Sequence, residues 1–429
     1  MLSTHVSDTQ NSAHVWDDGR VTAPGSISAA RLLAIRPFRL LWTNSFLFTL
    51  VQSTQRFAFV WLALGLGARS DASGLILFVM GVPALLISLP VGVLSDHFNR
   101  RALLIISQTG ALAVAVTTAA LVSADVITIP LAIGCSFASG IFIALGTPVR
   151  SAIVPTLVPR EQLVGAIATS TIGNNIGLII GPATAGPMIT AWGIQGAFWF
   201  QAVLYALGLL ALLPLELPPP HNTERKSLRN EIFGGITFIR QNRAVRSFFV
   251  LLGCSVLFMM SPWIVLGPQI AKEEVGASGG QTTLLFALLG VGQLLTSVGI
   301  MRWNRVIRQK GLWFMCGLCW GSSIQVLLGQ SFNILTLGLF LFLWGMGGGF
   351  YMNLNQTLIQ NNTPPQVMGR VMAIQSLLMS GLAPAGALLV GLIARSIDSA
   401  PLVFSGCGAL MLLSTLYFLF FHRHLRPMA

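Results

Sequence analysis

Residues 92–101 read GVLSDHFNRR, a short polar break where one long apolar segment, near residues 73–94, gives way to another, near 102–123. Each apolar segment has about 20 residues, which is enough for an α-helix to cross a bilayer core of about 30 Å. A carboxylate, a turn-forming asparagine and two arginines are gathered in the break. We therefore expect a loop at the membrane surface that joins two transmembrane helices.

The same alternation continues along the chain. Of its 429 residues, 54% are hydrophobic and only 9% are charged, whereas about a quarter are charged in soluble domains. This composition excludes an ordinary soluble protein and predicts an all-α membrane protein with twelve spans. The spans are expected near residues 40–66, 73–94, 102–123, 126–148, 163–190, 194–215, 247–270, 282–303, 311–330, 334–357, 371–394 and 401–421.

The positive charge follows a topological pattern. If the chain starts in the cytoplasm, alternate loops collect all of the 25 Lys and Arg except Arg56, Arg69, Lys272 and Arg395. The positive-inside rule then places both termini in the cytoplasm. The net charge of +12 is accordingly explained by orientation, and no nucleic-acid partner is expected. Residues 1–37 lack the apolar stretch of a signal peptide and are expected to be a cytoplasmic tail.

Two halves of the chain repeat each other. Gly140 and Gly345 are 205 residues apart, and the same offset pairs Pro159 with Pro364 and Gly186 with Gly391. Two parallel six-helix repeats predict a site near the membrane midplane, with the halves rocking about it. The expected units are a six-helix bundle over 38–217, a cytoplasmic connector with an amphipathic helix over 218–246, a second bundle over 247–421 and a cytoplasmic tail over 422–429.

The break at 92–101 resembles the loop signature of the major facilitator superfamily. The resemblance implies the fold of that superfamily and a cytoplasmic gate, in which a carboxylate faces a helix end and the arginines bond across the two halves. Asn99 stands where the family usually has glycine, and asparagine tolerates the left-handed backbone that such a turn needs. The expected gating residues are Gly92, Asp96, Arg100, Arg101 and, at the end of the fourth span, Arg150.

A second resemblance concerns the direction of transport. Residues 177–187, GLIIGPATAGP, are similar to the motif of exporters in this superfamily, with Gly177, Gly181, Pro182 and Gly186 as its matching residues. Residues 38–42 and 146–161 are similar to the bacterial branch that holds enterobactin-type siderophore exporters and macrolide efflux proteins. The resemblance implies a multi-pass exporter of the bacterial inner membrane.

Arg56 is the residue that says most about the substrate. It lies well inside the first span, and no Asp, Glu or His lies in any span. A charge at this depth is costly unless a ligand or partner offsets it, so Arg56 is expected to bind an anionic group. The full set of expected substrate-binding residues is Gln52, Gln55, Arg56, Phe59, Asn174, Met260, Trp263, Gln293, Asn353 and Gln356.

The sequence thus favours a secondary-active exporter of a small polar or anionic metabolite, with a siderophore fitting best. Two alternatives stay open: a broad drug or macrolide efflux pump, and a lysophospholipid flippase. The driving force is an ion gradient, a coupling proton among the candidates, or the substrate's own gradient. An enzyme, a cofactor and a metal site are not expected, because the six histidines lie in tails or loops and no ligand cluster has the required spacing. A monomer in contact with membrane lipid is expected.

Overall fold

The computed structural model describes residues 29–67, 69–97, 99–159, 162–217, 228–303, 309–330, 333–422 and 425–426. Within these ranges the regular structure is helical throughout. The N-terminal half contains α1 (Ala29–Ala34), α2 (Arg36–Gly65), α3 (Ser70–His97), α4 (Arg100–Ser123), α5 (Ile129–Ile153) and α6 (Leu163–Leu212), with a short 3₁₀ turn at Val154–Thr156.

A connector helix, α7 (Leu228–Gln241), precedes the second half. The C-terminal half contains α8 (Arg243–Ser255), α9 (Ser261–Gln269), α10 (Gly279–Trp303), α11 (Lys310–Leu328), α12 (Ile334–Asn361), α13 (Pro365–Ile397) and α14 (Ala400–Phe421). A π-helical turn at Val256–Met260 joins α8 to α9 without a break, and a second π-helical turn at Ile270–Glu274 extends α9.

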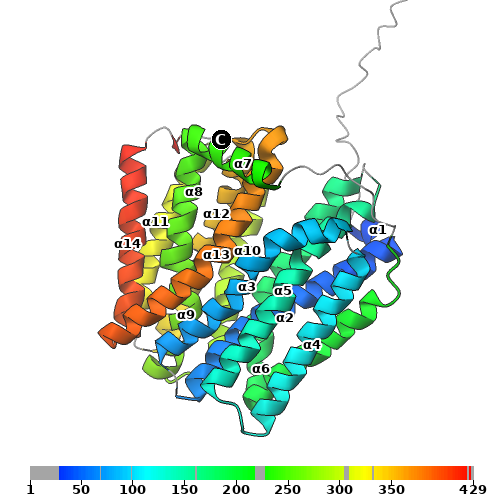
Figure 1. The fold of residues 1–429 in the computed structure, drawn as a ribbon. Helices are drawn as coiled ribbons and strands as arrows, with labels where there is room; N and C mark the ends of the chain where they lie inside the picture. Colours follow the sequence, from blue (N-terminus) through cyan, green and yellow to red (C-terminus); the bar gives the residue numbers. More distant parts are fainter. Residues whose placement is uncertain are drawn as a thin grey trace, which may run out of the picture.

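The helices form two bundles, one from each half (Figure 1). The bundles lie apart at the end that carries α1 and α7, and they converge at the opposite end. At the convergent end α3 packs on α13, and α6 packs on α10. We call the end that carries α1 and α7 the α7 end, and the opposite end the convergent end.

Two local features depart from a simple reading of the sequence. Asn99 has φ −61°, so it is not left-handed as expected; it caps α4 instead, where its side chain accepts from the backbone N–H of Arg101 and Ala102. Helix α6 runs through two expected spans without an intervening loop. Trp192 and Gly193 leave helical geometry there, and the φ of +69° at Gly193 is one that glycine adopts easily.

Ten helical segments of the described chain are long and apolar enough to cross a membrane. Helix α2 and the first part of α6 are not among them. Helix α2 has 30 residues, but polar side chains such as Asn44, Gln52 and Gln55 lower its hydropathy. The chain is thus a multi-pass membrane protein, and the number twelve stays a prediction.

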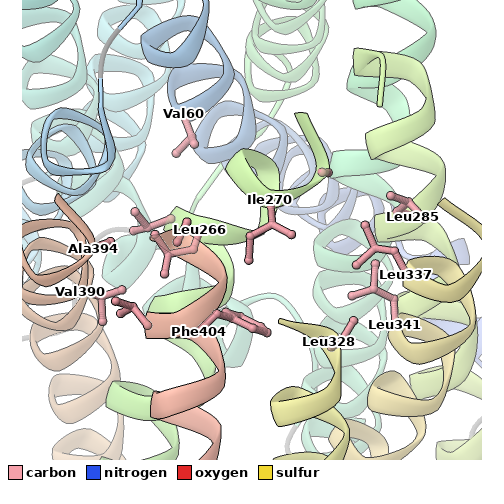
Figure 2. Packing of buried hydrophobic residues seen from close by; sticks show 14 of the residues in the cluster. Val60, Leu266, Ile270, Leu285, Leu328, Leu337, Leu341, Val390, Ala394 and Phe404 are labelled. Atoms are coloured by element: carbon pink, nitrogen blue, oxygen red, sulfur yellow. The ribbon is translucent and has the colours of Figure 1, made fainter. Parts of the chain in front are cut away.

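The convergent end has an apolar core shared by both halves. Val60 of α2 and Leu77 of α3 belong to the same buried cluster as Leu266 of α9 and Val390 of α13. Figure 2 shows Val60 facing the group formed by Leu266 and Ile270. Between transmembrane helices such a core contributes through close van der Waals packing, so it favours contact between the halves at the convergent end.

Candidate functional site

A cavity of about 990 Å³ lies between the two bundles. Its described lining comes from α2, α3 and α5 of the first half and from α8 to α13 of the second, while α4, α6 and α14 supply none of it. The walls are largely apolar, with Met80, Met259, Trp263 and Trp344 among them. A cavity of this size is in the range that holds a small organic molecule.

Arg56 lines this cavity, as the sequence predicts, and so does Gln52 one helical turn before it. Arg56 is half-buried, and its guanidinium has no hydrogen bond or ion pair to any residue that the structure describes. No Asp, Glu or His appears in the described lining. The positive charge is therefore available to a ligand.

Gln55 and Phe59 lie elsewhere, and the expectation that they share the cavity face is wrong. Gln55 donates to the hydroxyl of Ser139 at 3.0 Å and accepts from that of Tyr205 at 3.5 Å. Phe59 is fully buried and packs edge-on against Phe198 at 5.3 Å. Adjacent residues of a helix differ by about 100° in direction, so Arg56 faces the cavity while its neighbour Gln55 faces the inside of the first bundle.

Of the remaining expected substrate-binding residues, some line the cavity and others do not. Met260, Trp263 and Gln293 line the cavity. Asn353 does not, because its amide donates to Ser297 at 2.8 Å and so joins α12 to α10.

Gln356 is exposed and its amide contacts the sulfur of Met372. Asn174 accepts a hydrogen bond from Thr49 at 3.2 Å and lines a side pocket of about 100 Å³. Gln52 lines both this pocket and the main cavity. The structure thus places Asn174 beside the main cavity and Gln356 away from it.

Aromatic side chains close the cavity toward the convergent end. Trp263 packs against Trp344 at 5.4 Å and against Phe286 at 4.6 Å. Phe286 in turn meets Phe57 of the first half edge-on at 5.3 Å. Edge-to-face pairs of this kind add about 0.5–1.5 kcal/mol each beyond area burial. Aromatic contacts between the two halves therefore border the cavity on the side of the convergent end.

At the α7 end, the described hydrogen bonds of the gating residues Arg100 and Arg101 stay within the first half. Arg100 donates to the carbonyl oxygen of Ala152 at 3.3 Å, and Arg101 donates to that of Leu213 at 2.6 Å. Both carbonyls are at helix ends of the first half, where a cation is favoured by the helix dipole. The expected bonds across the interface are thus absent from the described contacts of these arginines. The side chains of Gly92 and Asp96 are outside the described residues.

Arg150 is a second cation inside the first bundle, which the sequence reading placed at the boundary of the fourth span. It is 6% exposed. Its guanidinium donates to the amide oxygens of Asn44 at 2.9 Å and Gln108 at 2.8 Å, and lies 3.6 Å above the ring of Phe48. These partners are neutral and hold the charge by dipoles and cation–π attraction. In the sequence, the only signal that Arg150 would be held inside the bundle was the presence of two amides, Asn44 and Gln108, in the first and third apolar segments.

The glycines of the expected export motif bring α6 close to both halves. A β-carbon on Gly181 would lie 2.7 Å from the backbone oxygen of Leu50 in α2. Thr54 of α2 donates to the carbonyl oxygen of Gly181 at 2.7 Å. A β-carbon on Gly186 would overlap the side chain of Thr283 in α10. Small residues allow this close approach; the side chain of Pro182 is outside the described residues.

Gly177 makes a similar contact one turn earlier, where Ser53 of α2 donates to its carbonyl oxygen at 3.1 Å. A β-carbon on Gly177 would lie 3.2 Å from the backbone nitrogen of Leu50. The motif therefore packs α6 against α2 over two turns before it reaches the second half.

Three of the four cations that break the positive-inside pattern bridge the halves at the convergent end. Arg395 pairs with Asp71 at 2.5 Å, and Arg69 pairs with Asp398 at 3.5 Å. The third, Lys272, donates to the carbonyl oxygen of Leu64 at 2.8 Å. Leu64 is in the last turn of α2, where a positive charge is favoured.

We expect Lys272→Met to weaken the closure of the convergent end. A cation at a helix C-terminus contributes about 0.3–1 kcal/mol and up to about 2 kcal/mol when partly buried, so the population open at this end should rise about fivefold. Distances between spin labels at Val126, in the link between α4 and α5, and at Leu335, in the first turn of α12, would report the change at this end. Lys310→Met, at the start of α11, is the matched control. Equal populations in both variants would show that Lys272 does not hold the halves.

The chain belongs to the Major Facilitator Superfamily. A profile of that family matches residues 41–387 and 248–428. The fold is that of solved transporters: the nucleoside transporter NupG superposes with a TM-score of 0.71 at 12% identity, covering 90% of this chain and 99% of the other. The peptide transporter POT in complex with sulfate gives a TM-score of 0.71 at 14% identity, covering 94% of this chain and 99% of the other.

Relatives by sequence are bacterial transporters. The Staphyloferrin A transporter of Staphylococcus aureus is 24% identical over 393 residues, or 90% of this chain and 97% of the relative. The enterobactin exporter EntS of Escherichia coli is 27% identical over 275 residues, or 64% of this chain and 65% of the relative. Macrolide efflux protein A of Streptococcus pyogenes is 26% identical over 274 residues, or 61% and 65%. The family and these relatives are transporters and not enzymes, and this protein is a membrane transporter of the same superfamily.

Proposed function

We propose that this protein is a secondary-active exporter that moves an anionic organic metabolite, a siderophore by preference, out of the bacterial cytoplasm by alternating access. The observation that carries the proposal is the unpaired guanidinium of Arg56 in a cavity whose described lining holds no carboxylate. A positive cavity attracts anions and disfavours cations. Relatives that carry siderophores support the same substrate class.

We place both termini and α7 on the cytoplasmic side of the bacterial inner membrane, and with this orientation the open α7 end corresponds to an inward-facing state. The bundles lie apart at the α7 end (Figure 1), and charged and aromatic contacts hold the convergent end. A substrate would then enter the cavity from the cytoplasm and bind at Arg56. Release on the far side requires the contacts of Lys272, Asp71 and Arg69 to open while the α7 end closes.

A macrolide or other apolar drug is the second candidate. Its support is the apolar wall formed by Met259, Trp263 and Trp344, together with the relatedness to macrolide efflux protein A. Such a substrate would bury apolar area against this wall but would leave Arg56 without an anion. The unmet charge makes this candidate the weaker one.

Everted membrane vesicles from a host without its own siderophore exporters test the proposal. Vesicles with this protein should accumulate iron-free staphyloferrin A or enterobactin when energised, and should not accumulate erythromycin. A protonophore that stops accumulation would support antiport with protons, whereas uptake that only equalises the concentrations on the two sides and is unaffected by the protonophore would favour the substrate's own gradient. Accumulation of erythromycin with exclusion of both siderophores would contradict the proposed function.

A further inference from the structure

A second arginine reaches the cavity, and it comes from the opposite half. Arg370 lies near the start of α13 and lines the same cavity as Arg56. These two are the charged residues in the lining that the structure describes. Arg370 is half-buried and has no hydrogen bond or ion pair to a described residue.

The internal repeat shows that this charge is not required by the fold. The position equivalent to Arg370 in the first half, 205 residues earlier, is Gly165. Both helices continue in the same way through these positions. In the second half the connector helix covers the arginine: a β-carbon on Gly234 of α7 would lie 2.9 Å from Nη1 of Arg370. The glycine leaves room for the guanidinium at the α7 end of the cavity.

Packing contacts give the relative depth of the two arginines. Gln55, the neighbour of Arg56, bonds to Ser139 of α5. The next residue of α5, Gly140, packs on the backbone of Met80, and a β-carbon on Gly81 would overlap Pro384 of α13. Arg56 is therefore near the level of Pro384.

Arg370 is four turns of α13 before Pro384, which is roughly 20 Å toward the α7 end. The two arginines therefore lie at different depths of the same cavity.

We propose that Arg370 is a second anion-binding residue and that the cavity takes an elongated organic substrate with acidic groups at two ends, one on Arg56 and one on Arg370. The inference rests on the proposed function and narrows its substrate class to diacids or polyacids. Two unpaired guanidinium groups favour a substrate with at least two negative charges, because each charge-assisted bond is stronger than a neutral one. The apolar wall between them accommodates the organic body.

The two arginines belong to different halves, so a diacid would bind best when the halves hold both at the right separation. Only a ligand with different affinity for two states can shift the balance between them. The affinity of a diacid should differ strongly between the two states, because both arginines must be in place. The affinity of a monoacid that contacts Arg56 alone should differ less. The substrate's second acidic group thus couples binding to the rocking of the halves.

Isothermal titration calorimetry on the full-length protein in nanodiscs tests the inference. The probes are adipate, sebacate and dodecanedioate, each beside its monomethyl ester, and the proteins are wild type, Arg56→Gln, Arg370→Gln and the double variant. Arg302→Gln is the control, because Arg302 is an exposed arginine at the same end of the molecule, outside the described cavity lining. We expect Arg370→Gln to weaken the best diacid about tenfold to a hundredfold and to leave its monoester unchanged.

The double variant separates the inference from the proposed function. For the diacid, the losses from the single changes should be non-additive, as for two residues that hold one ligand. If Arg56→Gln weakens both probes while Arg370→Gln weakens neither or weakens both equally, the second site is wrong and the proposed function stands. If Arg56→Gln weakens neither probe, the proposed function itself fails.

Discussion

Replacing Arg56 with glutamine should reduce export of the native substrate to background while the protein reaches the membrane in normal amounts. The side chain faces the cavity without a described partner, so its loss removes a contact to the ligand and leaves no buried group unpaired. A hydrogen bond to a charged group contributes about 1.5–3 kcal/mol, which corresponds to about tenfold to a hundredfold in affinity. Uptake into everted vesicles at low substrate concentration measures the loss.

Arg56→Lys should retain part of the activity, because lysine keeps the charge but not the planar two-point contact of a guanidinium. Arg246→Gln serves as the control: Arg246 is an exposed residue of α8 that donates to the carbonyl oxygen of Arg240. If Arg56→Gln exported the substrate at the wild-type rate, Arg56 would have only a structural role and the preference for anions would be abandoned.

Gly74→Val should abolish transport by keeping α3 and α13 apart. A β-carbon at this position would lie 2.6 Å from the backbone oxygen of Ala387 and 3.3 Å from the Cα of Leu388. Backbone atoms cannot move aside as the end of a flexible side chain can, and overpacking costs about 1–3 kcal/mol even in adaptable cores. The variant should therefore favour the state in which the convergent end is open, as seen by spin-label distances between Val126 and Leu335.

The matched control is Gly134→Val, another glycine-to-valine change within a helix of the first half. Gly134 is in α5, and its β-carbon would meet no atom within 4 Å. This control carries the same cost of a β-branched residue in a helix without the steric conflict. Wild-type transport by Gly74→Val, or an equal loss in Gly134→Val, would show that close contact of α3 and α13 is not part of the cycle.

Much of the fold could be predicted from the sequence because its signals are local. The helix junction within 92–101, the apolar segments and the repeat each follow from residue type and spacing, and the family match confirms the superfamily. The expected loop is shorter than predicted, because α3 continues to His97 and α4 begins at Arg100. The break inside α6 falls between the expected spans 163–190 and 194–215, although Trp192 and Gly193 change the direction of the chain without a polar loop. The polar side chains of α2 lower its hydropathy, and α2 is not among the ten segments that are apolar enough to cross a membrane.

The site was predictable only in part, because cavity lining depends on helix rotation and on tertiary contacts. The position of Arg56 deep inside the first span predicted that it lines the cavity. The predicted cavity-facing surface of α2 was too wide, because it also included Gln55 and Phe59. Arg150 was read as a boundary residue, although neutral amides hold it inside the bundle. The sequence did not predict that Arg370 lines the cavity. It lies just before the expected span 371–394, where a basic residue is typical of a cytoplasmic loop.

A structure of the protein with its transported metabolite bound would test the central claim most directly. We predict an acidic group of the ligand in the cavity, with its oxygen atoms roughly 2.7–2.9 Å from the guanidinium nitrogens of Arg56. The organic body should lie against Trp263 and Trp344. A ligand that occupies the cavity with its acidic groups turned away from Arg56, or a bound substrate without an acidic group, would contradict the account.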